Sequence, residues 1–111
     1  MDGADIVLAT LPQADGKQKL RPALLIKELP GYSDWLVVGI SSQVGQSIPG
    51  WDVQIDIGSP GNECTGLKTD SVIRRSFIAV VPKNLISGKI GSVPRAVISL
   101  IKQRLSQFLA G

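Results

Sequence analysis

The chain has 111 residues, 43% of them hydrophobic and 19% charged, a composition typical of a folded domain rather than of a disordered segment. We therefore expect a single domain over residues 1–111 with a modest core. The net charge of +3 favours polyanions only weakly, compared with the clustered basic patches of dedicated nucleic-acid binders. The lack of histidine and the single cysteine, Cys64, exclude histidine-based catalysis, an internal disulfide and the common zinc sites.

No apolar run in the sequence approaches the roughly 18 residues of a membrane span. The N-terminus lacks the basic segment and apolar run of a secretory signal. A lone cysteine is also compatible with a reducing compartment. We expect a cytoplasmic protein without a membrane segment.

Apolar runs separated by turn-forming residues predict three strands in the first part of the chain. These strands are expected over residues 5–11, 21–29 and 35–43. The intervening loop 12–20 carries an Asp-Gly step and two lysines, Lys17 and Lys19, so it should be exposed.

A fourth strand is predicted over residues 51–57, where side chains alternate strictly between apolar and polar. This alternation is typical of an antiparallel strand with one wet face. We expect Asp52, Gln54 and Asp56 on that wet face.

Residues 70–81, DSVIRRSFIAVV, predict a fifth strand with two consecutive arginines. Successive side chains of a strand point to opposite faces, so Arg74 and Arg75 cannot share one. We expect Arg74 and Ser76 to face a groove, and Arg75 to lie on the inner side with its stem extending to a rim. Three apolar side chains should pack inward on that side: Ile73, Phe77 and Val81.

The last part of the chain predicts a helical turn at residues 83–86, a short strand near residues 89–90 and a helix from Ser92 onward. Ser92 is the expected N-cap, with Pro94 in the first turn. The apolar face of the helix should consist of Val93, Val97, Ile101, Leu105, Phe108 and Leu109. Together these elements predict a mainly β fold, a small twisted antiparallel barrel with one terminal helix packed against it.

Arginines and hydroxyls are the side chains left to carry chemistry. Arg21 stands at the start of the second strand, Ser41 and Ser42 end the third, and Arg74 lies in the fifth. Guanidinium groups match phosphate geometry, so this set can hold a phosphodiester and stabilise charge on it without a metal. Alternatively, Arg21 bridges a surface carboxylate, Arg74 pairs with Asp52 or Asp56, and the serines merely end a strand.

Three stretches of this sequence resemble MazF/PemK-like toxins, in the order found in that family. They are DIVLATLPQADGKQKLRPALLI, VVGISSQ, and GLKTDSVIRRSFIAVVPKNLISGKIGSV followed by an apolar helix. The resemblance covers nearly the whole chain. It implies an SH3-like barrel of the CcdB/MazF type with a C-terminal helix, usually assembled as a homodimer.

The resemblance also implies the toxin component of a type II toxin-antitoxin system. Its activity would be sequence-specific, metal-independent and cofactor-free cleavage of single-stranded RNA, often mRNA, restrained by a cognate antitoxin. Attack by the RNA's own 2′-hydroxyl would give a 2′,3′-cyclic phosphate. Arg21 and Arg74 would stabilise the charge on the phosphorane and Ser41 would orient the phosphate, while the RNA-binding residues would be Lys17, Lys19, Ser42, Gln43 and Ser76.

The sequence departs from the family pattern at three positions. Ala4 replaces the usual glycine before Asp5, Ser41 replaces the more frequent threonine, and Ser76 stands where some PemK-type members place an aspartate suggested as general base. Serine does not serve as a base at neutral pH without an activating partner. The alternative function is therefore a catalytically inert or CcdB-like relative that acts by binding a protein, either an antitoxin or gyrase.

Overall fold

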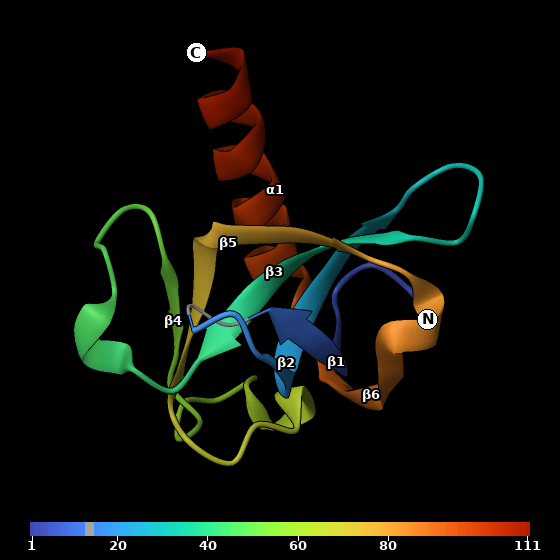
Figure 1. The fold of residues 1–111 in the computed structure, drawn as a ribbon. Coiled ribbons are helices and arrows are strands. Elements are labelled where there is room, and N and C mark those ends of the chain that lie inside the picture. The colour runs from blue at the N-terminus through green and yellow to red at the C-terminus, as the bar shows by residue number, and fades with distance from the viewer. Residues whose placement is uncertain (13–14) are drawn as a thin grey trace.

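The computed structural model describes residues 1–12 and 15–111, except the side chains of residues 12, 75 and 76. Six strands and one α-helix form this part of the chain (Figure 1). The strands are β1 (Asp5–Pro12), β2 (Gln18–Glu28), β3 (Trp35–Ser41), β4 (Val53–Ile55), β5 (Ser71–Val81) and β6 (Ile86–Ser92). The helix is α1 (Arg95–Ala110), and three 3-10 turns are η1 (Val44–Gln46), η2 (Glu63–Thr65) and η3 (Lys83–Leu85).

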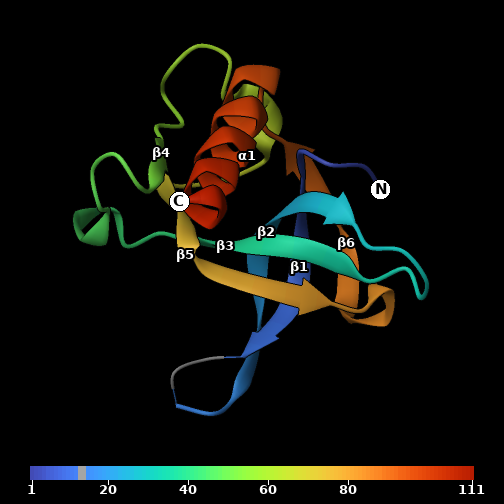
Figure 2. The ribbon, with the colours of Figure 1, turned by 90° about the horizontal axis from the view of Figure 1, so that it is seen from above.

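All six strands belong to one antiparallel sheet with the order β4-β5-β3-β2-β1-β6. The sheet is strongly twisted, and α1 lies across one of its faces (Figure 2). Within the described residues no ladder joins the edge strands β4 and β6, so the barrel is open. The predicted mainly β fold with one terminal helix is confirmed.

Two apolar clusters occupy opposite faces of the sheet, because β1, β2 and β3 are buried on both sides. The first cluster lies under α1 and contains Ile6, Leu24, Ile26, Val38, Ile40, Ile55, Ile73, Val93, Ile98, Ile101 and Leu105. The second cluster contains Val7, Ala9, Leu11, Ala23, Leu25, Trp35, Val37 and Val81. The uninterrupted apolar runs of these strands match this two-sided burial.

The prediction for residues 51–57 was only partly right. The strand is confined to Val53–Ile55, and Asp52 is 6% exposed rather than on a wet face. The carboxylate turns inward because its Oδ2 accepts a hydrogen bond from the Ile48 N–H at 3.0 Å, which closes the preceding turn. Strand periodicity does not apply before the ladder begins.

The helix differs from its prediction at both ends. Ser92 ends β6, and Pro94 occupies the N-cap, so the predicted Ser92 cap is wrong. Phe108 and Leu109 are 65% and 78% exposed, because α1 extends beyond the sheet at its C-terminal end (Figure 1). The Phe108 ring meets Trp51, in the loop before β4, edge to face with centroids 4.8 Å apart.

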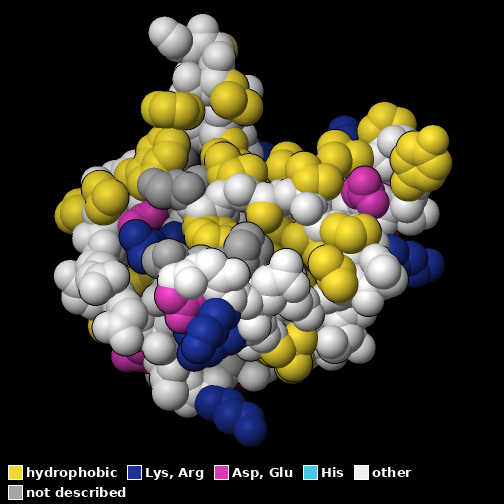
Figure 3. All heavy atoms as spheres, in the orientation of Figure 1, with side chains coloured by type: hydrophobic (Ala, Val, Ile, Leu, Met, Phe, Trp, Pro, Cys, Tyr) yellow, Lys and Arg dark blue, Asp and Glu magenta, His cyan; other side chains and the backbone are white. Residues whose placement is uncertain are grey.

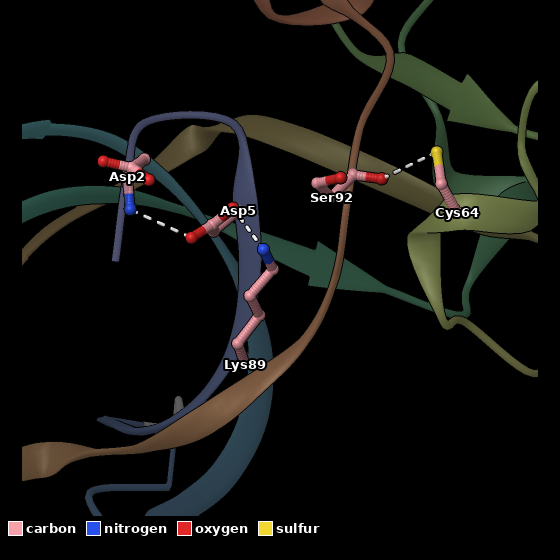
Figure 4. Close-up of polar contacts among 5 residues, drawn as sticks. All are labelled: Asp2, Asp5, Cys64, Lys89 and Ser92. Carbon is pink, nitrogen blue, oxygen red and sulfur yellow. Dashed lines mark hydrogen bonds and ion pairs between the residues drawn. The ribbon is translucent and has the colours of Figure 1, made fainter.

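Polar contacts connect the N-terminal segment and η2 to β6 (Figure 4). The buried Asp5 carboxylate accepts a hydrogen bond from the Asp2 N–H and forms an ion pair with Lys89 Nζ at 3.2 Å. Cys64 Sγ, just inside η2, donates to the Ser92 carbonyl at 3.2 Å. Among the described residues, no helix has the length and apolar character needed to cross a membrane.

Candidate active site

Arg21 and Ser41 are brought together by the pairing of β2 with β3. Ala23 lies opposite Gly39 in this ladder, and two residues further along each strand the register reaches Arg21 and Ser41. Both residues therefore lie at the same end of the sheet and on the same face as Ala23. Arg21 is exposed and Ser41 is half-buried.

Ser41 is oriented by a local turn at the end of β3. Its Oγ accepts a hydrogen bond from the Gln43 N–H at 3.0 Å. A hydroxyl that accepts in this way retains its own O–H for donation to another group. Ser41 can thus donate to an anion that approaches the end of the sheet.

An irregularity in the pairing of β5 with β3 places Arg74 at the site. Val38 pairs with Ile78 and the next residue, Gly39, pairs with Arg74. Residues 75–77 therefore form a bulge outside the ladder. Such a bulge changes the direction in which the side chains of the strand point. Because the number of extra residues is odd, side chains that would share a face of a regular strand point to opposite faces on the two sides of the bulge. Ile73 therefore joins the cluster under α1, while Val81 joins the cluster on the opposite face. The expectation that these two side chains share a face was wrong for this reason.

Five of the predicted site residues line a single pocket of about 230 Å³, here called the arginine pocket. They are Arg21, Ser41, Ser42, Gln43 and Arg74. The rest of the lining is Leu11, Gly39, Ile40 and Phe77. Sequence reasoning placed Phe77 away from Arg74, but the bulge puts both in the same pocket.

Arg74 is half-buried and lines the arginine pocket. Its Nε is buried and has no hydrogen-bond partner among the described residues. The alternative in which Arg74 pairs with Asp52 or Asp56 finds no support, since the ion pair formed by the described side chains joins Lys89 to Asp5. An unpaired buried donor is costly, and the side chain that carries it lines the arginine pocket.

The two loop lysines lie outside the arginine pocket. Lys17 and Lys19 are exposed, and Lys19 lies directly opposite the pocket residue Leu11 in the β1–β2 ladder. Figure 3 shows Lys and Arg side chains near this hairpin. Residues 13–14 of the predicted loop and the side chains of Arg75 and Ser76 lie outside the described part, so the expected role of Ser76 stays a prediction.

A second pocket of about 430 Å³ adjoins the first and was not predicted. It shares Arg21, Ile40, Ser41 and Ser42 with the arginine pocket, and its lining also includes most residues of the segment 66–71. We call it the Lys68 pocket after the cation in its wall. The segment before β5 has no periodicity, so the sequence offered no signal for it.

The site offers cations and hydroxyls rather than metal ligands. No Asp or Glu is among the described residues that line either pocket. The described part of the chain also contains no cluster of three His, Cys, Asp or Glu residues suited to a metal ion. The arrangement is suited to binding a phosphodiester through charge-assisted hydrogen bonds.

Several solved structures share this fold. The Mycobacterium tuberculosis toxin MazF-mt6 matches with a TM-score of 0.68 and 19% identity over 96% of both chains. An endoribonuclease in complex with its cognate antitoxin, and an endoribonuclease alone, both from mycobacterial species, match with TM-scores of 0.68 and 17% identity. These matches cover 99% of this chain and 95% and 91% of theirs.

The family relationship is shown by sequence. No match was found among curated proteins. Residues 2–109, however, match the family model described as PemK-like, MazF-like toxin of type II toxin-antitoxin system. Since this match spans nearly the whole chain and the fold agrees with it, the chain belongs to the PemK-like, MazF-like toxins of type II toxin-antitoxin systems.

Proposed function

We propose that this toxin is a sequence-specific endoribonuclease that cleaves single-stranded RNA, including mRNA, without a metal. The observation that carries the proposal is the arginine pocket, in which Arg21 and Arg74 flank Ser41 and the Arg74 Nε is buried without a partner. Similar solved structures described as endoribonucleases support the reaction class. Action on mRNA implies that the toxin works in the cytoplasm.

The scissile phosphate would bind between the two arginines. Arg21 approaches from β2 and Arg74 from β5, with Ser41 on the intervening strand β3. Each guanidinium can donate two parallel hydrogen bonds to phosphate oxygens. Binding from two strands fixes the orientation of the phosphate as well as its position.

The proposed reaction is an internal transfer at phosphorus. The 2′-oxygen attacks the adjacent phosphorus as its proton passes to solvent, and the bond from phosphorus to the 5′-oxygen breaks. The products are a 2′,3′-cyclic phosphate and a 5′-hydroxyl, whose oxygen takes a proton from solvent. Arginine stays protonated throughout, so Arg21 and Arg74 act by stabilising the charge that builds on the phosphorane.

Ser41 would orient the phosphate through its O–H. The hydrogen bond from the Gln43 N–H fixes the position of Ser41 Oγ, so the hydroxyl needs little reorganisation when substrate binds. Threonine at this position would preserve the same group. The replacement of the family's threonine by Ser41 is therefore compatible with activity.

The remaining RNA contacts would come from the rim of the pocket. Ser42 and Gln43 line it and can hydrogen-bond to RNA. Lys17 and Lys19 on the hairpin would attract the backbone by charge. Ser76 is proposed as a further contact from β5, on the basis of the family resemblance alone.

Two protein partners are proposed. A cognate antitoxin would restrain the enzyme, as the structure of an endoribonuclease with its cognate antitoxin suggests. A second copy of the chain would cover the apolar side chains Ile78 and Val80 of β5, which are 48% and 54% exposed. Figure 3 shows hydrophobic side chains along β5 and around α1.

Light scattering coupled to size exclusion tests the homodimer. The expected mass is twice the 11.8 kDa of one chain, and Val80→Lys should shift it toward the monomer. A monomeric wild-type protein at micromolar concentration would contradict this part of the proposal.

Incubation with a long single-stranded RNA in EDTA tests the nuclease. Wild type should cleave, and Arg21→Ala and Arg74→Ala should each lose activity by about 100-fold or more while remaining folded. Arg95→Ala is the matched control, because Arg95 is exposed and lines neither pocket. Lack of cleavage by wild type would favour the alternative of an inert or CcdB-like relative that binds antitoxin or gyrase.

A further inference from the structure

We propose that the Lys68 pocket binds the nucleobase next to the scissile phosphate, and that Lys68 and Thr69 determine which base is accepted. This inference rests on the proposed cleavage of RNA and extends it to sequence recognition. The pocket is separate from the residues assigned to charge stabilisation, except where the two pockets meet.

The arrangement of the two pockets fits a single strand that crosses the end of the sheet. Their common boundary is lined by four residues, Arg21, Ile40, Ser41 and Ser42. A phosphate held at this boundary would have one neighbouring nucleotide on each side. Away from this boundary the arginine pocket continues toward Arg74 and Phe77, which line that pocket alone, while the Lys68 pocket continues toward Lys68, which lines only the second pocket.

The composition of the Lys68 pocket suits a base. Its lining combines apolar residues with polar groups suited to the edge of a ring. The apolar residues are Leu8, Pro22, Ile40, Leu67 and Ile90. The polar side chains are Lys68, Thr69 and Ser71. A volume of about 430 Å³ falls within the range of small-ligand sites.

The wall of this pocket is preorganised by local hydrogen bonds. Thr65 Oγ1 donates to the Asn62 carbonyl at 2.8 Å and accepts from the Leu67 N–H at 3.3 Å. Ser71 Oγ donates to the Thr69 carbonyl at 2.9 Å. These contacts fix the segment before and after Lys68, which lowers the entropic cost of binding.

Close backbone contacts between the segment 65–66 and β6 also hold this part of the pocket lining in place. Gly66 has a φ of +70°, and a Cβ at that position would collide with the Ile90 carbonyl. A Cβ on Gly91 would likewise collide with the Thr65 carbonyl. The contact of Cys64 with Ser92 continues this attachment (Figure 4). The position of Lys68 relative to the phosphate site is thus set by the fold.

The chemistry of the two side chains indicates the class of base. The Lys68 ammonium only donates hydrogen bonds, so it matches an edge with carbonyl acceptors, as in guanine or uracil. The Thr69 hydroxyl can donate or accept at a neighbouring position of the same edge. We therefore expect a guanine or uracil in this pocket rather than an adenine.

Two parallel measurements on the intact protein test the inference. The first uses a randomised pool of short 2′-O-methyl RNAs, which cannot be cleaved, and measures base enrichment at each position among the bound molecules. The second maps cleavage sites in a long RNA by sequencing. Wild type should enrich guanine or uracil at one position by about tenfold. Lys68→Met should abolish this enrichment, and Lys68→Arg should retain most of it.

Lys83→Met is the matched control, because Lys83 is exposed, carries the same charge and lines neither pocket. It should leave base enrichment unchanged. Unchanged enrichment in Lys68→Met, or no enrichment by wild type at any position, would overturn the subsite. Base enrichment that is lost in Lys68→Met, together with no RNA cleavage by wild type, would support the base-binding subsite and contradict the proposed nuclease activity.

Discussion

The ring of Phe77 lies directly against the backbone of Gly39. A Cβ on Gly39 would be 2.9 Å from Phe77 Cδ1 and 3.1 Å from Cγ. Gly39 lies opposite Arg74 in the β3–β5 ladder, and all three residues line the arginine pocket. The absence of a side chain at Gly39 therefore determines the position of the ring beside the proposed phosphate site.

Gly39→Ala should displace the Phe77 ring into the pocket. We expect the free energy of unfolding to fall by about 1–3 kcal/mol because the ring and the new methyl group overlap. The rate of RNA cleavage should fall by about tenfold or more, since small misplacements of reacting groups reduce rates strongly. Gly88→Ala is the control, because a Cβ at Gly88 meets nothing within 4 Å. Cleavage by Gly39→Ala at the wild-type rate would show that the ring does not shape the active site.

Removal of the Ser41 hydroxyl should impair catalysis more than folding. We expect Ser41→Ala to lower kcat/KM by about 100-fold, as loss of one preorganised donor does elsewhere, and Ser41→Thr to retain most activity. Ser87→Ala, at an exposed position outside both pockets, should behave as wild type. Equal activity of the alanine and threonine variants would remove Ser41 from the mechanism.

Ala4 has a left-handed backbone that favours glycine. Its φ is +78°, and hydrogen bonds from the Ala4 N–H to Leu25 and from the Val93 N–H to Ala4 hold this conformation, both at 2.9 Å. A side chain in this left-handed region costs about 1–2 kcal/mol. Glycine avoids this cost, but its greater flexibility in the unfolded chain offsets part of the gain. Ala4→Gly should therefore raise the free energy of unfolding by up to about 1 kcal/mol.

Urea unfolding measures this effect. Ala96→Gly, at an exposed helical position, should instead destabilise by about 0.5–1 kcal/mol. A destabilised Ala4→Gly would show that the left-handed conformation of Ala4 is not strained.

Lys17 and Lys19 should contribute salt-dependent RNA affinity. Each lysine that neutralises one phosphate of a single strand contributes about 0.7 to the slope of log affinity against log salt. Lys17→Gln and Lys19→Gln should each reduce that slope by about this amount in binding of 2′-O-methyl RNA. Lys83→Gln should leave the slope intact, and equal slopes for all variants would place the RNA away from the hairpin.

All six strands, the helical turn and the terminal helix were predicted from the sequence, because long apolar runs dominate β1, β2, β3 and β5; β4 is shorter than predicted and β6 is longer. The site residues Arg21, Ser41, Ser42, Gln43 and Arg74 were suggested by strand ends and the family resemblance, and they line one pocket. Phe77 was misplaced because alternation holds only within a regular ladder, and residues 75–77 leave it. Asp52 and Phe108 were misplaced because local turns and helix length, not periodicity, decide burial near element ends.

Identification of the RNA ends tests the proposed chemistry most directly. A synthetic RNA containing a mapped cleavage site, and the same RNA with one 2′-O-methyl group at the attacking ribose, are incubated with the protein in EDTA and analysed by mass spectrometry. We expect a 2′,3′-cyclic phosphate and a 5′-hydroxyl from the first RNA, and intact second RNA. Cleavage of the methylated RNA, or products with 5′-phosphates, would contradict attack by the RNA's own 2′-hydroxyl in the arginine pocket.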